Sequence, residues 1–396
     1  MAPRRLPRQP AGSDVAAGSG RRSARRYGGR IDPPSILDAQ VVLPCADLGP
    51  TVAFFTERLG FRVRTIWPAD APAHAVVAGA GLLLLLEPGD GPPGWLRLRC
   101  ADPDAVAGGL RTLVAPNGTR VDLLDADPPL VIPPLVPELV VSRAGDGAAW
   151  GDGRAGMQYR DLIPGRQGGR FIASHIRIPD AGPVPDYVHF HDIRLQLIFC
   201  RRGWVRLVYE DQGPPFVLHE GDCVLQPPRI RHRVLDCSAG MEVVELGCPA
   251  DHETHADATL VLPTDRVDAD RDFGGQRFAR HVAAEATWTP WRFGGFEQRD
   301  VGIAAATDGL AGVRVVRRAG PSAGPSAGAA WRHGGELLFL FVLDGAITLR
   351  LTGAAPIVLG VDDSVTVPAG VAHALTDASV DAQLLEVSLP AVLAEA

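Results

Sequence analysis

Two histidines separated by one residue constrain the fold of this chain more than any other feature. His189 and His191 lie in the segment PDYVHFHDIRLQLIFC, and residues two apart in a β-strand point to the same face. The runs LQLIFC and GWVRLVYE that follow have the apolar or alternating pattern of strands. A Gly-Asp turn, a Pro-Pro stop and His232 come after them. We therefore expect neighbouring antiparallel strands that bring three imidazoles together inside a small barrel.

An amide side chain can join these imidazoles. Gln196 lies an odd number of residues after His191, so a bend or bulge must intervene before both side chains face the same cavity. Imidazoles are suitable ligands for Fe, Mn, Ni, Cu or Zn. We predict one divalent metal ion (Fe, Mn, Ni or Zn, with its identity open) bound by His189, His191, Gln196 and His232. The alternative is a barrel whose histidines hold no metal.

The same segment resembles the cupin family, whose two motifs occur here in order. The matching residues are His189, His191, Gly203, Gly221, Asp222, Pro227 and His232. Four residues precede Gln196 and six follow it before the glycine, which is the family's spacing, but the family usually has Glu at this position. A Gln carbonyl is a neutral and weaker ligand. The resemblance implies a jelly-roll barrel with a metal site.

The C-terminal part resembles a second cupin barrel, because VDDSVTVPAGVAHAL mirrors GDCVLQPPRIRH. When the two halves are aligned on the glycine that ends the first motif, His333 and His373 fall at the positions of His191 and His232. The same alignment places Trp331 and Leu338 at the other two ligand positions, and Glu336 could substitute for one of them if the strand shifted. We predict a weak second site of His333, Glu336 and His373. The alternative is a purely structural half.

The N-terminal part resembles the vicinal-oxygen-chelate family, which includes glyoxalase I and bleomycin-resistance proteins. The segment VVLPCADLGPTVAFFTERLGFRV reads as a strand, a helix and a Leu-Gly-Phe turn. Three strands follow, and a shorter repeat contains a helix over residues 103–113. The resemblance places ligands at Gln40 and Glu87, but a third position falls near Trp95, which cannot ligate. We predict a degenerate, metal-free scaffold, with a site completed by a second chain as the alternative.

The chain has 396 residues, enough for two or three domains. Its Gly and Pro content favours turns and short strands. The expected fold is mainly β, with two cupin jelly-roll barrels preceded by an α+β domain of βαβββ order. The expected segments are a disordered Arg-rich tail (1–34), the vicinal-oxygen-chelate-like domain (35–143), a linker (144–156), the first barrel (157–264), an inter-barrel segment (265–298) and the second barrel (299–396).

Candidate substrate-binding groups surround the first motif. Arg194 lies two residues before Gln196, so its guanidinium could face the same cavity and bind a carboxylate. The alternative is a salt-bridged Arg on the barrel wall. Tyr187 and Gln226 are further candidates, whereas Glu242 and Glu245 are interpreted as charges at the edge or rim of the barrel.

Three functions remain open for such a protein. The cupin resemblance favours a metal-dependent oxygenase that acts on a small organic acid or an enolic metabolite, since oxygenases of that family work with three histidines. A non-catalytic protein that binds or sequesters a small molecule is one alternative, and a metal-dependent isomerase or lyase is another.

The composition argues against nucleic-acid and membrane partners, so we expect the partner to be a small-molecule ligand or substrate. The net charge of −7 and pI near 5.9 give no support for a nucleic-acid surface, and no apolar run approaches the ~20 residues of a membrane helix. Six cysteines without a Cys-x-x-Cys pair, and no signal peptide, predict buried thiols in a cytoplasmic protein. All 39 basic residues are Arg, which suggests a GC-rich bacterial genome. A homodimer is left open.

Overall fold

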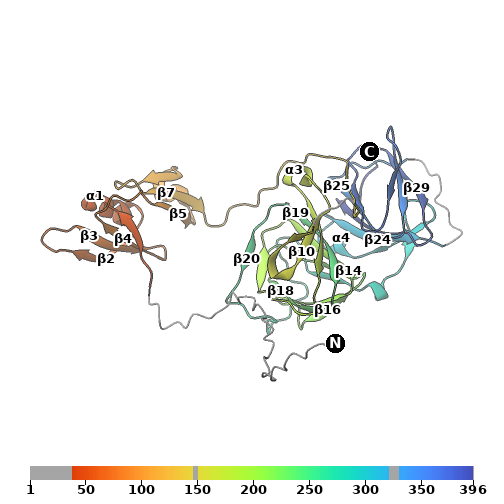
Figure 1. Ribbon diagram of the computed structural model, residues 1–396, viewed down its shortest axis with the longest axis horizontal. Coiled ribbons are helices and arrows are strands. Elements are labelled where there is room, and N and C mark those ends of the chain that lie inside the picture. Colours follow the sequence, from red (N-terminus) through yellow and green to blue (C-terminus); the bar gives the residue numbers. More distant parts are fainter. Residues whose placement is uncertain (1–37, 146–149, 321–329, 396) are drawn as a thin grey trace, which may run out of the picture. The chain divides into compact units, whose positions relative to one another are not determined.

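The computed structural model describes residues 38–145, 150–320 and 330–395. The tail predicted over residues 1–34 lies outside the described residues. The chain divides into two compact units, Met1–Pro128 and Pro129–Ala396, which Figure 1 shows in red to orange and in yellow to blue. No helix in the described part of the chain is long and apolar enough to cross a membrane.

The first unit has the predicted βαβββ order. Its first sheet has the order β1-β4-β3-β2, and β1 runs parallel to β4. Phe55, at the end of the helical segment, is fully buried against this sheet. The elements are β1 (Val41–Pro44), α1 (Leu48–Ala53), a π-helical turn (Phe54–Arg58), β2 (Arg62–Trp67), β3 (His74–Gly79) and β4 (Leu82–Glu87).

A shorter repeat completes this unit as a sheet of order β5-β7-β6. The predicted helix over residues 103–113 was too long, because Gly108 and Gly109 adopt positive φ and end it. Its first turn is capped by Asp102, whose side chain accepts a hydrogen bond from the Ala105 amide at 3.0 Å. The elements are β5 (Trp95–Cys100), α2 (Pro103–Ala107), β6 (Thr112–Val114) and β7 (Arg120–Asp125).

The metal ligands that resemblance placed in this unit do not meet. In the parallel pair of β1 and β4, Val41 lies beside Leu84 and Pro44 beside Glu87. Gln40 therefore precedes one end of the pair and Glu87 ends the other, about 13 Å away along the strands. Within one chain, the two ligand positions that the resemblance gave, Gln40 and Glu87, therefore do not form a site.

The second unit begins with a barrel of two sheets. The first has the order β21-β17-β14-β19-β11-β10-β9, and the second has the order β16-β15-β18-β13-β20 with β12 paired to β18. The strands are β9 (Gly151–Asp152), β10 (Gln158–Asp161), β11 (Ile172–Ile178), β12 (Gly182–Pro183), β13 (His189–His191), β14 (Leu195–Arg202), β15 (Trp204–Tyr209), β16 (Phe216–His219), β17 (Cys223–Leu225), β18 (His232–Cys237), β19 (Met241–Cys248), β20 (Thr254–Ala256) and β21 (Ala279–His281).

A second barrel follows with the same arrangement. Its sheets have the orders β22-β23-β24-β30-β25-β28-β8 and β27-β26-β29. The strands are β8 (Val140–Ser142), β22 (Thr289–Pro290), β23 (Phe296–Asp300), β24 (Gly312–Arg318), β25 (Leu337–Asp344), β26 (Ile347–Leu351), β27 (Ile357–Leu359), β28 (Ser364–Thr366), β29 (His373–Ala378) and β30 (Gln383–Leu389). The short helices of this unit are α3 (Arg166–Gly169) and α4 (Ile303–Ala306).

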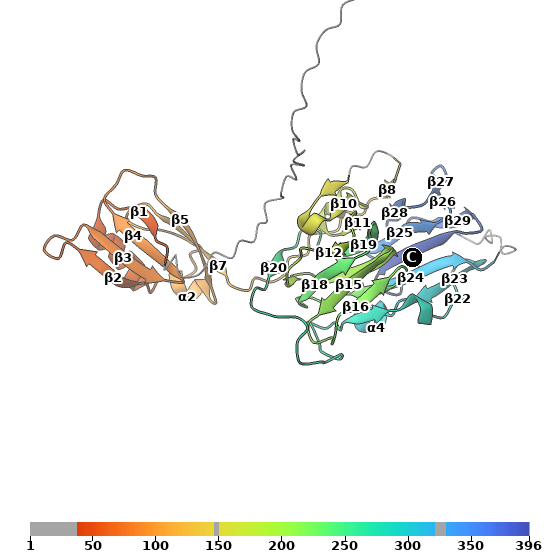
Figure 2. The same ribbon diagram turned by 60° about the horizontal axis from the view of Figure 1, so that its bottom comes forward.

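Three segments that were expected to lie outside the two barrels form edge strands of them. Strand β8, from the end of the expected N-terminal domain, pairs with β28 of the second barrel, as Figure 2 shows. Strand β9, from the expected linker, pairs with β10, and β21, from the expected inter-barrel segment, pairs with β17. These boundaries differ from the predicted ones because an edge strand needs only backbone pairing, which Gly-rich and Pro-rich composition does not reveal.

The two barrels share one hydrophobic core. Phe199 on β14 and Phe341 on β25 are both buried in it, together with side chains of β19 and β30. A polar cluster borders this core, in which Glu336 bonds Arg170 at 2.6 Å and Arg194 at 3.0 Å. Because the apolar surface of each barrel is covered by the other, we expect the pair to unfold together.

Replacing Phe341 with Ala tests this expectation. Removal of the fully buried ring should lower the free energy of unfolding by about 3–5 kcal/mol. Native-state hydrogen exchange should show lost protection in β14 and β19 as well as in β25. Val358→Ala, at an exposed position of the second barrel, is the control and should change little. Lost protection confined to the second barrel would contradict a shared core.

Candidate metal centre

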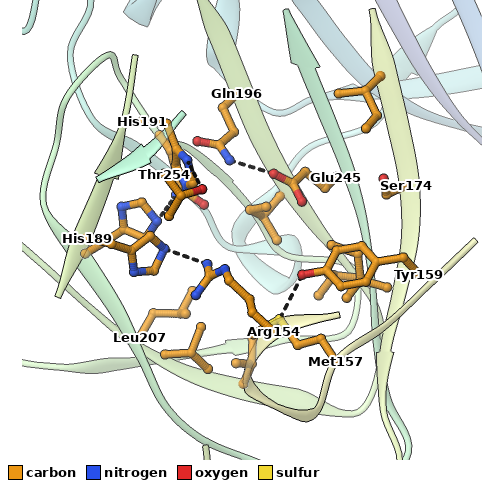
Figure 3. Close-up of a pocket in the computed structure, with 18 of the residues that line it drawn as sticks. Arg154, Met157, Tyr159, Ser174, His189, His191, Gln196, Leu207, Glu245 and Thr254 are labelled. Carbon is orange, nitrogen blue, oxygen red and sulfur yellow. Dashed lines mark hydrogen bonds between the residues drawn. The ribbon is translucent and has the colours of Figure 1, made fainter. Parts of the chain in front are cut away.

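Three imidazoles converge inside the first barrel, as the His-x-His spacing predicts. His189 and His191 lie on β13, and His232 begins β18, where it is directly opposite His189 in the antiparallel pair. One ring nitrogen of each lies within 4.8 Å of the others, and all three side chains are buried. Figure 3 shows the first two at one side of the cavity. The barrel therefore assembles a possible set of three nitrogen ligands.

The second ring nitrogen of each histidine has its own partner. Nδ1 of His189 donates to the Tyr187 carbonyl at 2.8 Å, and Nδ1 of His232 donates to the Ile230 carbonyl at 3.0 Å. Nδ1 of His191 lies 3.1 Å from the Thr254 hydroxyl. In two of the three, the acceptor is the carbonyl two residues earlier. In His189 and His232 the carbonyl can only accept, so it fixes the tautomer and leaves the lone pair on Nε2 for a metal, as outer partners of metal-binding histidines do.

Burial keeps these imidazoles neutral. It lowers the pKa of His191 to about 3, with neighbouring His189 adding to the effect. Burial also lowers the pKa of His189, which lies beside the Arg154 guanidinium, and lowers that of His232 well below its ordinary value. A metal ion needs the neutral ring, so no proton has to leave these nitrogens near neutral pH. The donor set therefore fits a divalent transition metal.

The imidazoles line a cavity of about 320 Å³. Most of its wall is apolar, with Met157, Ile172, Ile176, Ile198, Leu207, Met241 and Val243 among its lining residues. The polar lining residues other than the three histidines are Arg154, Tyr159, Ser174, Gln196, Gln226, Glu245, His252 and Thr254. A few polar groups in an apolar pocket are typical of a small-molecule site.

Gln196 faces this cavity from β14, on a different strand from His191. Its Nε2 donates a hydrogen bond to Glu245 Oε1 at 2.6 Å, so its Oε1 is the atom left for a metal. The interpretation of Glu245 as a rim charge was wrong, because its carboxylate lines the cavity. Glu242, on the same strand, is also no rim charge, since it bonds His175 at 2.9 Å. Gln196 is thus hydrogen-bonded to a carboxylate on the neighbouring strand β19.

The predicted substrate-binding residues take three different places. Gln226 lines the cavity, with Nε2 at 2.8 Å from Nε2 of His232. Tyr187 is exposed and lies beside the His189 ring at 5.7 Å between centroids, outside the cavity lining. Arg194 does not line the cavity, and the salt-bridged alternative holds instead, since its guanidinium bonds Glu336 between the barrels. Arg194 precedes β14, so the alternation of a strand does not apply to it.

Arg154 is the site residue that the sequence analysis missed. Its Nη2 lies 2.7 Å from Nε2 of His189, and its Nη1 donates to Asp186 Oδ1 at 2.6 Å. The residue falls in the segment interpreted as a linker. Tyr159, which follows in β10, also lines the cavity. Burial, and then the nearby carboxylate of Glu245, raises the pKa of Tyr159 to about 12, so this phenol is a hydrogen-bond donor at neutral pH.

The predicted second site is not assembled. His333 and His373 are buried with ring centroids 6.1 Å apart, but Nε2 of His333 is bonded to the Val367 carbonyl at 2.8 Å. Glu336 points to Arg170 and Arg194 between the barrels, so it is no ligand. Its position ahead of β25 turns it out of the second barrel, and the prediction of His333, Glu336 and His373 as one site is wrong.

A buried ion cluster occupies the interior of the second barrel. Glu386 on β30 is fully buried and bonds both Arg292 and Arg314. Burial by itself would raise the pKa of Glu386, but the two guanidiniums, Arg292 foremost, hold it below its ordinary value. The Arg292 guanidinium also packs over the Trp331 ring at 4.5 Å. In the second barrel, the interior carboxylate of Glu386 is thus paired with two guanidinium groups.

Comparisons with known proteins give one family match and several similar solved structures. A family model described as Cupin domain matches residues 321–388, in the second barrel, and no curated protein matches. A variant of oxalate decarboxylase from Bacillus subtilis is similar over 67% of this chain and 80% of that chain, at 12% identity and a TM-score of 0.47. The formate complex of oxalate decarboxylase from Lactobacillus farciminis covers 67% of this chain and 89% of its own, at 13% identity and a TM-score of 0.47. The predicted mainly β fold with cupin jelly-roll barrels is confirmed, and the vicinal-oxygen-chelate resemblance stays a prediction.

The neutral histidines make the stability of the metal-free protein depend on pH. Below the ordinary histidine pKa of about 6.5 the unfolded chain binds protons that the folded barrel does not, so stability falls as pH falls. The loss should run from about 6.5 toward the lowered pKa of His191, which is about 3. Thermal unfolding of metal-free protein between pH 7.5 and 4.5 should show this decline.

A histidine variant isolates the contribution of the site. His191→Gln should reduce the slope of the pH dependence, whereas His219→Gln, at an exposed histidine, should leave it unchanged. Equal slopes for both variants would mean that His191 does not contribute to the acid sensitivity.

Proposed function

We propose that the first barrel binds one divalent metal ion through His189, His191 and His232, with the Gln196 carbonyl as a fourth ligand, and that the protein is an oxygenase acting on a small organic acid or an enolic metabolite. The observation that carries this proposal is the convergence of three neutral imidazole nitrogens within 4.8 Å beside a mostly apolar cavity. When bound, Fe(II) would supply redox chemistry and Mn or Zn would supply Lewis acidity.

The cavity favours a small anionic substrate. A volume of about 320 Å³ lies at the low end of the roughly 300–1,000 Å³ of small-molecule pockets. All four proposed ligands are neutral, so a divalent ion there would keep its full charge. Arg154 adds another positive group, and the two together outweigh the one carboxylate in the lining, Glu245. The apolar wall strengthens the attraction of these charges for an anion, because it lowers the local dielectric constant.

The chain's own residues would position and deprotonate the substrate. Tyr159 can donate a hydrogen bond, and the Glu245 carboxylate can accept a proton from an acidic O–H or C–H group of the substrate. The hydrogen bond from Gln196 holds that carboxylate toward the cavity. The presence of a carboxylate base also favours a second candidate, a metal-dependent isomerase or lyase, which needs proton transfer without O₂.

Metal content tests the ligand set. Protein purified without chelators should contain one Fe, Mn, Ni or Zn ion per chain by elemental analysis. His189→Ala and His232→Ala should each abolish stoichiometric metal, since each removes one of three imidazoles. His219→Ala, at an exposed position, should retain it. Unchanged metal content in the first two variants would overturn the proposed centre.

Oxygen consumption separates the two reaction classes. Metal-loaded protein should consume O₂ with at least one member of a panel of small carboxylic acids and enols, and His191→Ala should not. Conversion of the same substrate without O₂, slowed about 10²-fold or more by Glu245→Gln, would favour the isomerase or lyase. Tight binding with no conversion would support the non-catalytic alternative.

A further inference from the structure

Arg154 reaches the centre from a tight hairpin between β9 and β10. It begins the short helical turn Arg154–Gly156, in which Ala155 has a φ of 55°. The guanidinium extends toward His189, as Figure 3 shows. About one third of the Arg154 side chain is exposed, so it lies at the boundary between the cavity and solvent.

Two bonds of different kinds hold this guanidinium. Nη1 bonds Asp186, whose side chain is fully buried and is itself fixed by the Val234 amide at 2.9 Å. Nη2 bonds Nε2 of His189, whose other nitrogen donates to the Tyr187 carbonyl. Nε2 of a neutral imidazole has one lone pair. Arg154 therefore occupies the same lone pair that a metal ion would need.

The second barrel contains the matching hairpin. Arg292 follows β22 by two residues, as Arg154 follows β9 by two, and each short strand pairs with the next, β23 or β10. Arg292 bonds the buried carboxylate of Glu386. Glu386 lies opposite Leu340 in its barrel, as Glu245 lies opposite Ile198 in the first.

The two hairpin arginines bind different partners in the two barrels. In the second barrel the hairpin arginine, Arg292, bonds the carboxylate of Glu386 inside the barrel. In the first barrel Glu245 accepts its hydrogen bond from Gln196, while Arg154 bonds His189 instead. The hairpin arginine is thus in position to bind a carboxylate at the centre of its barrel, and in the first barrel that carboxylate can come from a ligand.

We propose that Arg154 couples metal binding to acid binding, an inference that rests on the proposed function of this site. In the metal-free protein Arg154 covers Nε2 of His189. When a metal ion takes that lone pair, Arg154 stays anchored to Asp186 and its freed N–H group binds the carboxylate of the acid. Binding of a metal ion alone breaks the Arg154–His189 hydrogen bond and brings the positive charges of the ion and of Arg154 together. A carboxylate bound between these two charges offsets both unfavourable effects. The metal and the acid therefore raise each other's affinity by the same factor.

Cobalt titration measures this coupling without any turnover. Metal-free protein at pH 7.5 is titrated with Co²⁺ by calorimetry, with and without saturating acetate as the carboxylate probe. In the wild-type protein acetate should tighten Co²⁺ binding about tenfold, the size of a coupling of roughly 1.4 kcal/mol. Arg154→Met should bind Co²⁺ about tenfold more tightly than wild type without acetate, because the competing donor is gone, and acetate should then have little effect.

Two further variants keep the test specific. Arg154→Gln retains amide donors without the charge, so it should also lose most of the acetate effect even if Arg154→Met folds poorly. Arg206→Met removes an exposed guanidinium paired with Asp236 on the outer face of β15, and it should behave as wild type.

The outcomes distinguish the inference from the proposed function. If wild-type protein binds no Co²⁺, the metal centre itself is wrong. If wild-type protein binds Co²⁺ but Arg154→Met and Arg154→Gln bind it no more tightly and keep the acetate effect, the metal centre stands and the role of Arg154 is wrong.

Discussion

A carboxylate buried inside a barrel must find a hydrogen-bond or cationic partner, and this requirement separates the two barrels. Each carries a Glu at the same register position of its last long strand, Glu245 or Glu386. Leaving such a group unpaired would cost several kcal/mol. Glu386 is bonded by two guanidiniums, whereas Glu245 has the neutral Gln196. The interior of the second barrel is therefore filled with paired charge. In the first barrel, the carboxylate of Glu245 faces a cavity.

The histidine set was predictable because its geometry is local. Alternation on one short strand places His189 and His191 on one face, and the second motif supplies His232 at the start of the paired strand. The carbonyl two residues before His189 and His232 then fixes the ring. All of these relations follow from residues within one or two strands, which is the range over which a sequence pattern predicts structure well.

The other cavity groups depend on long-range pairing and could not be found in the same way. Arg154 comes from a Gly-rich stretch whose only distinguishing property is the pairing of β9 with β10. Glu245 stands in the strand MEVVELGC, where a charged residue predicts a solvent-facing position because buried carboxylates are rare. Arg194 and Glu336 meet between the two barrels, a contact that neither barrel's pattern contains. The sequence therefore predicted the ligand histidines but not the charges around them.

The second barrel supports the first through packing, and this role does not depend on ligands in its own interior. The shared core requires only apolar side chains such as Phe339 and Phe341 on the face of β25 that meets the first barrel. The opposite face of the same strand carries Leu338, at the position equivalent to Gln196, and it packs with the interior of the second barrel. Trp331 and the Arg292 guanidinium stack nearby. Leu338 and Trp331 thus belong to a filled interior, while Phe339 and Phe341 form the surface that faces the first barrel. The two faces of one strand therefore contribute to two different cores.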